Sequence, residues 1–150
     1  SIAQALSAFS QGDTVFQGVS AERLYQAFAG FCQRMHASGI YFRDLSGGNI
    51  LVSQQGKQLN FALIDTARLH AYPTATPHGE RMADLTRAIQ KLHWVGRKQF
   101  LAYYLGVSAS RLGLWTLLPF YRYDLKVYLK RRIGRKGWKR LLRYIKQQRS

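Results

Sequence analysis

Three polar side chains stand at the ends of short apolar runs in the middle of the chain. Asp44 follows Ile-Tyr-Phe-Arg, Asn49 opens Asn-Ile-Leu-Val, and Asp65 closes Leu-Ile-Asp. Phosphoryl transfer needs a carboxylate to orient the attacking hydroxyl and metal ions to hold the nucleotide phosphates. Magnesium prefers oxygen ligands and usually takes only one or two from the protein. The order Asp44, Asn49, Asp65 therefore predicts a phosphotransferase site.

A predicted β-hairpin brings two of these residues together. Residues 49–52 read as one strand, 59–65 as a second strand, and 53–57 as a turn containing Gly56. Antiparallel pairing places the start of the first strand beside the end of the second. We therefore expect Asn49 and Asp65 to lie at the same end of the hairpin.

Helices are expected both before and after the hairpin along the chain, and we expect them to pack against it. The strongest signal is at 21–37, where Ser20 is a good N-cap and Gly39 a natural stop. One apolar stripe runs along this helix: Leu24, Phe28, Phe31 and Met35. Ile2, Leu6 and Phe9 indicate a short helix before it, followed by a turn at 11–13.

The second half reads as irregular chain around Pro73 and Pro77, followed only by helices. We expect a helix at 79–94 that is ended by Gly96 and another at 99–105 that is closed by Gly106. A further helix would be capped by Ser108 or Ser110, and Pro119 would end or kink it. Two last helices, 125–132 and 136–148, would be separated by a break at Gly134. These elements predict an α+β fold that is mostly α.

Composition limits the class of protein. The 150 residues are 47% hydrophobic, enough for one domain with a core. The single Cys32 excludes an internal disulfide framework. No apolar stretch approaches the ~20 residues of a membrane-spanning helix, and we expect no secretory signal.

Positive charge is concentrated near the C-terminus. Residues 121–150 hold twelve Lys or Arg and one acid, a net charge of +11, whereas 1–120 have a net charge of +5. We expect 1–120 to form the main domain and 121–150 a basic amphipathic helical tail. Trp138, Leu141, Leu142 and Ile145 would form its apolar face. Such a tail suits an anionic bilayer surface; a solvated charged face is the simpler interpretation, and no RNA-binding motif supports a nucleic-acid partner.

The central stretch resembles the catalytic loop of the protein-kinase-like superfamily. The matching pattern is His36-x-x-Gly39-Ile40-x-x-Arg43-Asp44-Leu45-x-x-x-Asn49-Ile50-Leu51, with Leu63-Ile64-Asp65 as the metal-binding strand end. Ser46-Gly47-Gly48, Asp65-Thr66-Ala67-Arg68, Arg81-x-x-Asp84-Leu85 and Trp94-x-x-Arg97 are more similar to the bacterial lipopolysaccharide kinase family, which phosphorylates Kdo or heptose of the core. The likeness covers about residues 20–105.

The resemblance implies a role for each matching residue. Asp44 would orient or deprotonate the sugar hydroxyl, and Arg43 would support the loop. Asn49 and Asp65 would hold Mg²⁺ and so bind ATP. Asp84 would accept hydrogen bonds from the loop backbone, and His36 would pack near the loop.

Two positions inside the loop depart from the superfamily pattern. Phe42 replaces the usual histidine, and Ser46 replaces a common lysine, which removes a cation near the transferred phosphate. Arg68 is a candidate substitute for that cation. The chain also shows no glycine-rich nucleotide loop before its first long helix, so we expect only the C-terminal lobe of a kinase-like fold: a helical bundle with a small hairpin, without the N-terminal lobe.

Three functions fit these observations. The first is an ATP-dependent kinase of lipopolysaccharide core sugar, expected in the cytoplasm at the inner face of the inner membrane and inactive without the nucleotide-clamping lobe. The second is a pseudokinase or a basic module that binds anionic surfaces. The third is a kinase of another small molecule or a protein.

Overall fold

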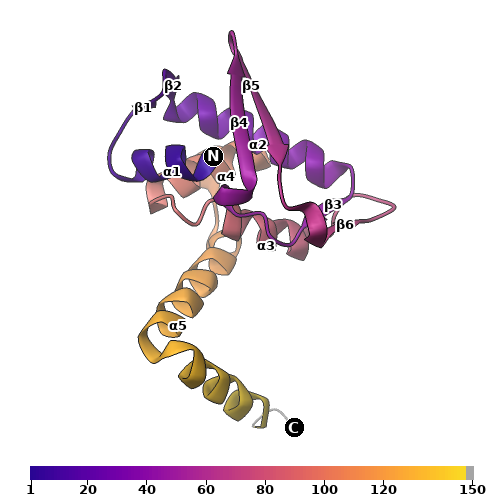
Figure 1. The fold of residues 1–150 in the computed structure, drawn as a ribbon, viewed down its shortest axis with the longest axis vertical. Helices are drawn as coiled ribbons and strands as arrows, with labels where there is room; N and C mark the ends of the chain where they lie inside the picture. The colour runs from indigo at the N-terminus through magenta and orange to yellow at the C-terminus, as the bar shows by residue number, and fades with distance from the viewer. Residues whose placement is uncertain (148–150) are drawn as a thin grey trace. The chain divides into compact units, whose positions relative to one another are not determined.

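The structure, a computed structural model, describes residues 1–147, excluding the side chains at 135, 136, 141, 142, 145 and 146. It divides into two compact units, residues 1–113 and 114–150. Figure 1 shows the order of the elements along the chain. None of the helices in the described part of the chain has the length and hydrophobicity that a membrane crossing requires.

The first unit starts with a short helix and a long one. Helix α1 (Ile2–Ser10) buries Ile2, Leu6 and Phe9, as the sequence predicts. Two short paired strands follow, β1 (Val15–Phe16) and β2 (Val19–Ser20), which the weakly patterned sequence does not reveal. Helix α2 (Ala21–Ala37) confirms the predicted helix, and its N-cap Ser20 accepts a hydrogen bond from the Arg23 N–H.

The predicted hairpin is present, although its first strand is longer than expected and its second strand ends at Leu63, before Asp65. Strands β4 (Ile50–Gln55) and β5 (Gln58–Leu63) pair from Ile50↔Leu63 to Gln55↔Gln58, so the turn is only Gly56–Lys57. The hairpin projects from the helices in Figure 1. At its tip, Arg23 of α2 donates a hydrogen bond to the Lys57 carbonyl, which joins the two elements.

A second ribbon was not expected from the sequence. Strand β3 (Ile40–Phe42) pairs with β6 (Leu69–Ala71), within the stretch read as irregular chain. Short 3₁₀ helices η1 (Gly47–Asn49) and η2 (Thr66–Arg68) connect these ribbons to the hairpin. A strand of three residues is too short to show an alternating pattern of apolar and polar residues. Its pairing partner also lies about thirty residues away in the sequence.

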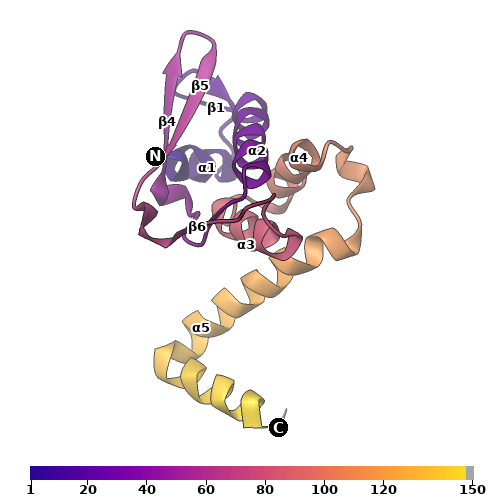
Figure 2. The ribbon, with the colours of Figure 1, turned by 90° about the vertical axis from the view of Figure 1, so that its right-hand side faces the viewer.

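Helix α2 forms the centre of the first unit. Figure 2 shows α2 between the hairpin and α4, and a cluster of aromatic rings fills these contacts. The fully buried Phe28 ring lies 5.6 Å from Phe61 of the hairpin and 5.3 Å from Phe100 of α4, measured between centroids. The predicted apolar stripe of this helix therefore faces the core.

Two helix boundaries in the second half differ from the prediction. Helix α3 (His78–Ala88) ends early, and α4 (Trp94–Leu105) begins before Gly96 rather than after it. The reason is His93, whose Nδ1 accepts the Gly96 N–H at 3.1 Å and caps α4. Arg97 supports the intervening turn by donating to the Leu92 carbonyl at 2.8 Å. Gly106 closes α4 in a left-handed conformation, as predicted.

The second unit is one interrupted helix, α5 (Leu114–Gln147), preceded by the 3₁₀ helix η3 (Ala109–Arg111). Gly134 leaves helical geometry with φ 67° and ψ 172°, which confirms the predicted break. The helix begins at Leu114 rather than after Ser108 or Ser110, and Pro119 lies inside it, so Pro119 does not end it as one form of the prediction had it. Pro119 is the sixth residue of α5, and it removes the N–H that would otherwise bond to the Trp115 carbonyl.

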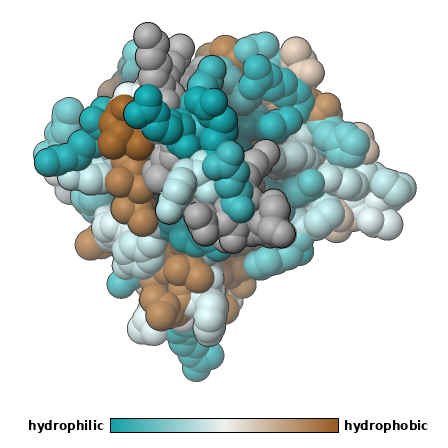
Figure 3. Space-filling view, turned by 90° about the horizontal axis from the view of Figure 1, so that it is seen from below, coloured by the Kyte–Doolittle hydropathy of each residue, from teal (hydrophilic) through white to brown (hydrophobic). Residues whose placement is uncertain are grey.

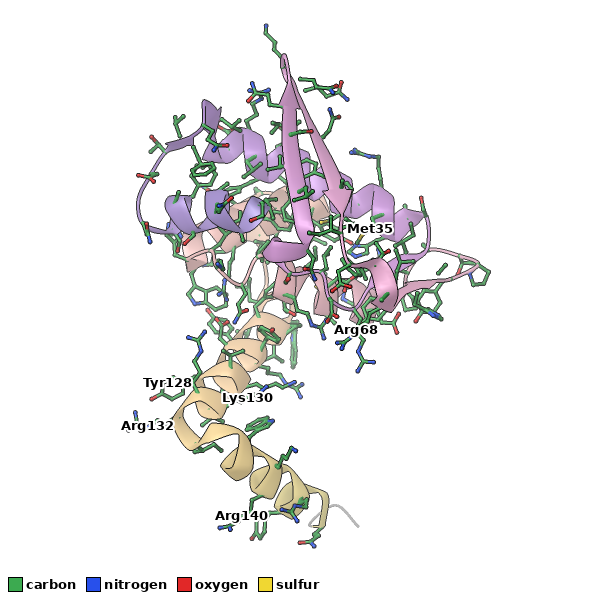
Figure 4. The ribbon with its side chains drawn as sticks, viewed as in Figure 1. Met35, Arg68, Tyr128, Lys130, Arg132 and Arg140 are labelled. Carbon is green, nitrogen blue, oxygen red and sulfur yellow. The ribbon has the colours of Figure 1, made fainter. Side chains whose placement is uncertain are left out.

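Helix α5 exposes apolar and basic side chains together. Leu125, Tyr128 and Ile133 are exposed, and Arg132 donates a hydrogen bond to the Tyr128 hydroxyl at 3.0 Å. Figure 4 labels Tyr128, Lys130, Arg132 and Arg140 along this helix. Figure 3 shows the molecule from below, where brown hydrophobic residues and teal hydrophilic ones are mixed on the visible face. Of the predicted apolar face, Leu141, Leu142 and Ile145 have side chains outside the described residues.

Candidate active site

Asp44 lies on a tight turn directly after β3. The Leu45 N–H donates to the Phe42 carbonyl at 2.8 Å, and this turn leaves the Asp44 side chain 35% exposed. The Asp44 backbone is also held, because its carbonyl accepts the Asn49 amide Nδ2 at 2.9 Å. The carboxylate is therefore accessible on a backbone that is fixed by local hydrogen bonds.

Asn49 and Asp65 lie at the base of the hairpin. The Ile64 N–H donates to the Asn49 carbonyl at 2.9 Å, one step beyond the Ile50↔Leu63 pair. Because Asn49 Nδ2 is used by Asp44, its Oδ1 is the atom left to accept a ligand. The structure thus brings Asp44 and Asn49 into contact and places Asp65 next to the residue that pairs with Asn49.

The backbone of Asp65 adopts an uncommon conformation. Its φ of 57° and ψ of 53° are left-handed, and its exposed carboxylate makes no cap hydrogen bond to the helix η2 that follows. A non-glycine residue in this region costs about 1–2 kcal/mol. Such strain frequently marks functional positions. The Asp65 carboxylate and Asn49 Oδ1 together are a donor set of the type that Mg²⁺ prefers.

Arg68 forms an ion pair with Asp44. Its Nη1 lies 3.1 Å from Asp44 Oδ2 and 3.4 Å from Oδ1, although the Arg68 side chain is 67% exposed. Figure 4 labels Arg68 on the turn that follows the hairpin. Exposed ion pairs contribute little stability. The main consequence of this ion pair is therefore geometric, because it holds a cation beside the candidate catalytic carboxylate.

A buried polar cluster supports the loop from below. Asp84 of α3 accepts the Phe42 N–H at 2.9 Å and lies 3.4 Å from His36 Nε2, all through its Oδ2 atom. The other His36 nitrogen, Nδ1, lies 2.8 Å from the Tyr104 hydroxyl of α4. All of these groups are almost completely buried. Three helices are thereby connected to the strand that precedes Asp44.

Burial raises pKa values in this cluster. It raises the pKa of Tyr104 to about 12, so the phenol keeps its proton beside His36 Nδ1. The other ring nitrogen, His36 Nε2, faces Asp84 Oδ2, which can accept a hydrogen bond from it. Burial also raises the pKa of Asp84, although the bonds from His36 and Phe42 act in the opposite direction. The neighbouring Cys32 is fully buried, and its thiol pKa is raised, which makes it an inert core residue.

Two glycines allow the backbone to approach closely around the loop. A Cβ on Gly39, at φ 78°, would collide with the carbonyl oxygens of Tyr72 and Thr74. A Cβ on Gly47 would lie 3.1 Å from the Ala3 Cα of α1. The small loop after Asp44 is therefore shaped by its contact with α1.

Some predicted residues are less closely connected, and some partners were missed. Arg43 is exposed, and no hydrogen bond or ion pair to the described residues ties it to the loop. Tyr104 completes the buried cluster but could not be identified from sequence, because it lies 68 residues from His36. Phe42 is fully buried and makes its hydrogen bonds through backbone atoms, so an apolar side chain suits this position.

Comparisons with known proteins identify a family and a similar fold. The sequence model of the lipopolysaccharide kinase (Kdo/WaaP) family matches residues 2–104. A solved structure of WaaP in complex with acyl carrier protein is similar, with a TM-score of 0.61 and 23% sequence identity over 82% of this chain. That likeness shows the fold, and the chain spans only 56% of the WaaP chain. No curated protein matches the sequence significantly.

Proposed function

The chain belongs to the lipopolysaccharide kinase (Kdo/WaaP) family, and we propose that the protein transfers a phosphoryl group from ATP to a sugar hydroxyl of the lipopolysaccharide core, on Kdo or heptose. We propose further that residues 1–113 are the C-terminal lobe of its kinase-like fold and that 114–150 form a separate basic tail. The observation that carries the proposal is the contact between the Asp44 turn and Asn49 at the base of the hairpin, where Asp65 lies two residues beyond the end of the other strand.

Asp44 is assigned to the acceptor hydroxyl. A carboxylate has about four lone-pair positions, so the ion pair with Arg68 leaves room for a hydroxyl to donate its proton. General-base assistance of this kind contributes typically about 10²- to 10⁴-fold. Arg68 supplies a positive charge beside the transferred phosphoryl group, in the role left open by Ser46.

Asn49 Oδ1 and the Asp65 carboxylate are assigned to Mg²⁺. Both are oxygen donors at the base of one hairpin, and neither is used in a hydrogen bond to the described protein atoms. When bound, Mg²⁺ neutralises charge on the nucleotide phosphates. The task of this half of the site is to hold these two oxygens and the Asp44 carboxylate in a fixed relation.

The direct test is phosphate transfer from ATP to purified core sugar by the full-length protein. We expect Asp44→Asn to lower kcat by about 10²-fold or more. The matched control is Asp13→Asn, which removes an exposed carboxylate from the turn after α1. Equal turnover by wild type and Asp44→Asn would contradict the proposal.

A non-catalytic pseudokinase is the alternative that this test must separate. Magnesium-dependent ATP binding that is lost in Asp65→Asn supports the kinase, when transfer is also observed. Nucleotide binding without transfer to any acceptor would favour the pseudokinase. Transfer to other small molecules or proteins, but not to core sugar, would favour a kinase of the same fold with another substrate.

We also propose that helix α5 binds the anionic cytoplasmic surface of the inner membrane. Its exposed Leu125, Tyr128 and Ile133 lie among basic residues, and each Lys or Arg near an anionic surface contributes about 1 kcal/mol. Co-sedimentation with vesicles containing anionic lipid should fall sharply between low and high salt. Equal binding to neutral vesicles would refute this role.

Acyl carrier protein, the partner of WaaP in its solved structure, is a candidate protein partner to include in the same assay.

A further inference from the structure

An open hollow lies beside Asp44, between strands β3 and β6. Tyr41 and His70 face each other across the paired strands, and Tyr72 continues β6 to the rim. Arg43, which precedes Asp44, and Arg68, its ion-pair partner, also line the hollow, together with Glu80 of α3. None of these six residues belongs to the hairpin base that is assigned to Mg²⁺.

The hollow offers donors and positive charge to a ligand. Arg43 and His70 are exposed, and no hydrogen bond or ion pair among the described residues occupies either side chain's polar atoms. Arg68 has several N–H groups besides the Nη1 that contacts Asp44. Arginine forks match the two oxygens of a carboxylate or phosphate.

The single acid in the lining is already engaged. Glu80 accepts a hydrogen bond from the Tyr72 hydroxyl, and this bond raises the pKa of Tyr72 to about 12. The other carboxylate oxygen of Glu80, Oε2, is buried and has no hydrogen-bond partner among the described residues. One oxygen of Glu80 therefore holds Tyr72 in place, and the other is shielded from solvent in the hollow.

We propose that this hollow is an anion subsite for the acceptor, which binds a carboxylate or phosphate carried by the sugar whose hydroxyl faces Asp44. The proposal rests on the proposed function, because it extends the same site to its second substrate. Arg68 is the physical link, since one guanidinium contacts Asp44 and lines the hollow. An acceptor that places its anion on Arg43 and His70 would thus bring a neighbouring hydroxyl toward the Asp44 carboxylate.

The experiment compares charged and neutral acceptors with the full-length protein. One pair is a Kdo-containing acceptor and its carboxyl methyl ester; a second pair is a phosphorylated core sugar before and after phosphatase treatment. We expect wild type to prefer the charged member of one pair by about tenfold to a hundredfold in kcat/KM, the range for a hydrogen bond to a charged group. The pair that shows the preference identifies the anion.

The variants are Arg43→Gln and His70→Gln, with Arg43→Lys as the conservative change. We expect both Gln variants to lower kcat/KM for the charged acceptor toward that of the neutral one and to leave the KM for ATP unchanged. Arg43→Lys should restore part of the preference. Arg34→Gln and His78→Gln are matched controls, because both residues are exposed and lie outside the hollow.

The outcomes separate this inference from the proposed function. Equal rates with charged and neutral acceptors, equal losses on both, or a rise confined to the KM for ATP would overturn the anion subsite. Calorimetric binding of the same acceptor pairs gives a readout that does not require turnover. If wild type transfers no phosphate but binds the charged acceptor more tightly, and Arg43→Gln removes that difference, the kinase proposal fails and the subsite stands.

Discussion

The buried carboxylate of Asp84 is the contact whose removal should most affect the turn that carries Asp44. In Asp84→Ala, the Phe42 N–H and the His36 Nε2–H both lose their acceptor inside the core. Each unpaired buried donor costs about 1–3 kcal/mol, so the variant should be about 2–6 kcal/mol less stable. That is a large part of the ~5–15 kcal/mol that holds a typical domain folded.

Asp84→Asn separates the hydrogen bonds from the charge. An Asn oxygen can accept both donors, and its NH₂ group would occupy the position of Oδ1, which is already buried without a partner. Folding raises the pKa of Asp84 above its unfolded value of 3.8, so the native state binds more protons in that window. Wild-type stability therefore falls as pH rises from below 3.8 through the folded pKa. Asn does not titrate, so the Asp84→Asn variant does not lose stability in this way. Its free energy of unfolding should therefore rise relative to that of wild type as pH increases across the same window.

Two measurements check this reasoning in the full-length protein. Urea unfolding of wild type, Asp84→Asn and Asp84→Ala between pH 3.5 and 7 gives the stability order and its pH dependence. Hydrogen exchange gives the protection of the Phe42 amide, which should fall at least tenfold in the Ala variant only. Asp13→Ala, on the surface, should stay within about 0.5 kcal/mol of wild type. Unchanged protection of Phe42 in Asp84→Ala would refute the argument.

Three further changes test the packing and the backbone. Gly39→Ala places a Cβ on a residue with positive φ, where it collides with two backbone carbonyls. The variant should lower the free energy of unfolding by about 2–5 kcal/mol in urea titration, and a loss below 1 kcal/mol would contradict the close approach. Phe28→Ala removes the ring at the centre of the aromatic cluster and should cost about 3–5 kcal/mol by thermal unfolding, whereas an exposed ring would cost far less. Gly134→Ala disfavours a conformation that is almost restricted to glycine, so α5 should straighten. Spin labels at Tyr128→Cys and Arg140→Cys would then move apart, and an unchanged distance would show that the break does not depend on glycine.

The sequence was most informative where the signal is local. The helix at 21–37 was predicted with its cap because Ser20, its apolar stripe and Gly39 all lie within one continuous segment. The hairpin was predicted because its two strands are neighbours in sequence. Local reasoning failed at Gly96, where a glycine was read as a stop although His93 caps a helix that runs through it.

Contacts between distant segments could not be read from the sequence. The β3–β6 ribbon joins residues about thirty positions apart through strands of three residues, too short to show an alternating pattern. The hollow beside Asp44 depends on that ribbon and was therefore missed. The residues of the candidate site were predicted without it, because their types and order indicate the chemistry even where the pairing is unknown; their roles stay a prediction.

The register of the β4–β5 hairpin has a consequence for insertions and for protein engineering. The relation between Asn49 and Asp65 is set at the base of the hairpin, by Ile50↔Leu63 and the bond from Ile64, whereas the chain reverses far away at Gly56–Lys57. Residues added in equal number to both strands lengthen the hairpin without changing which residues pair at its base. An unequal addition must be absorbed as a bulge or a longer loop. The number of residues between these two positions can thus change at the tip without changing the pairing at the base. The tip is therefore a suitable place to insert a peptide tag, at the loss of one contact with Arg23.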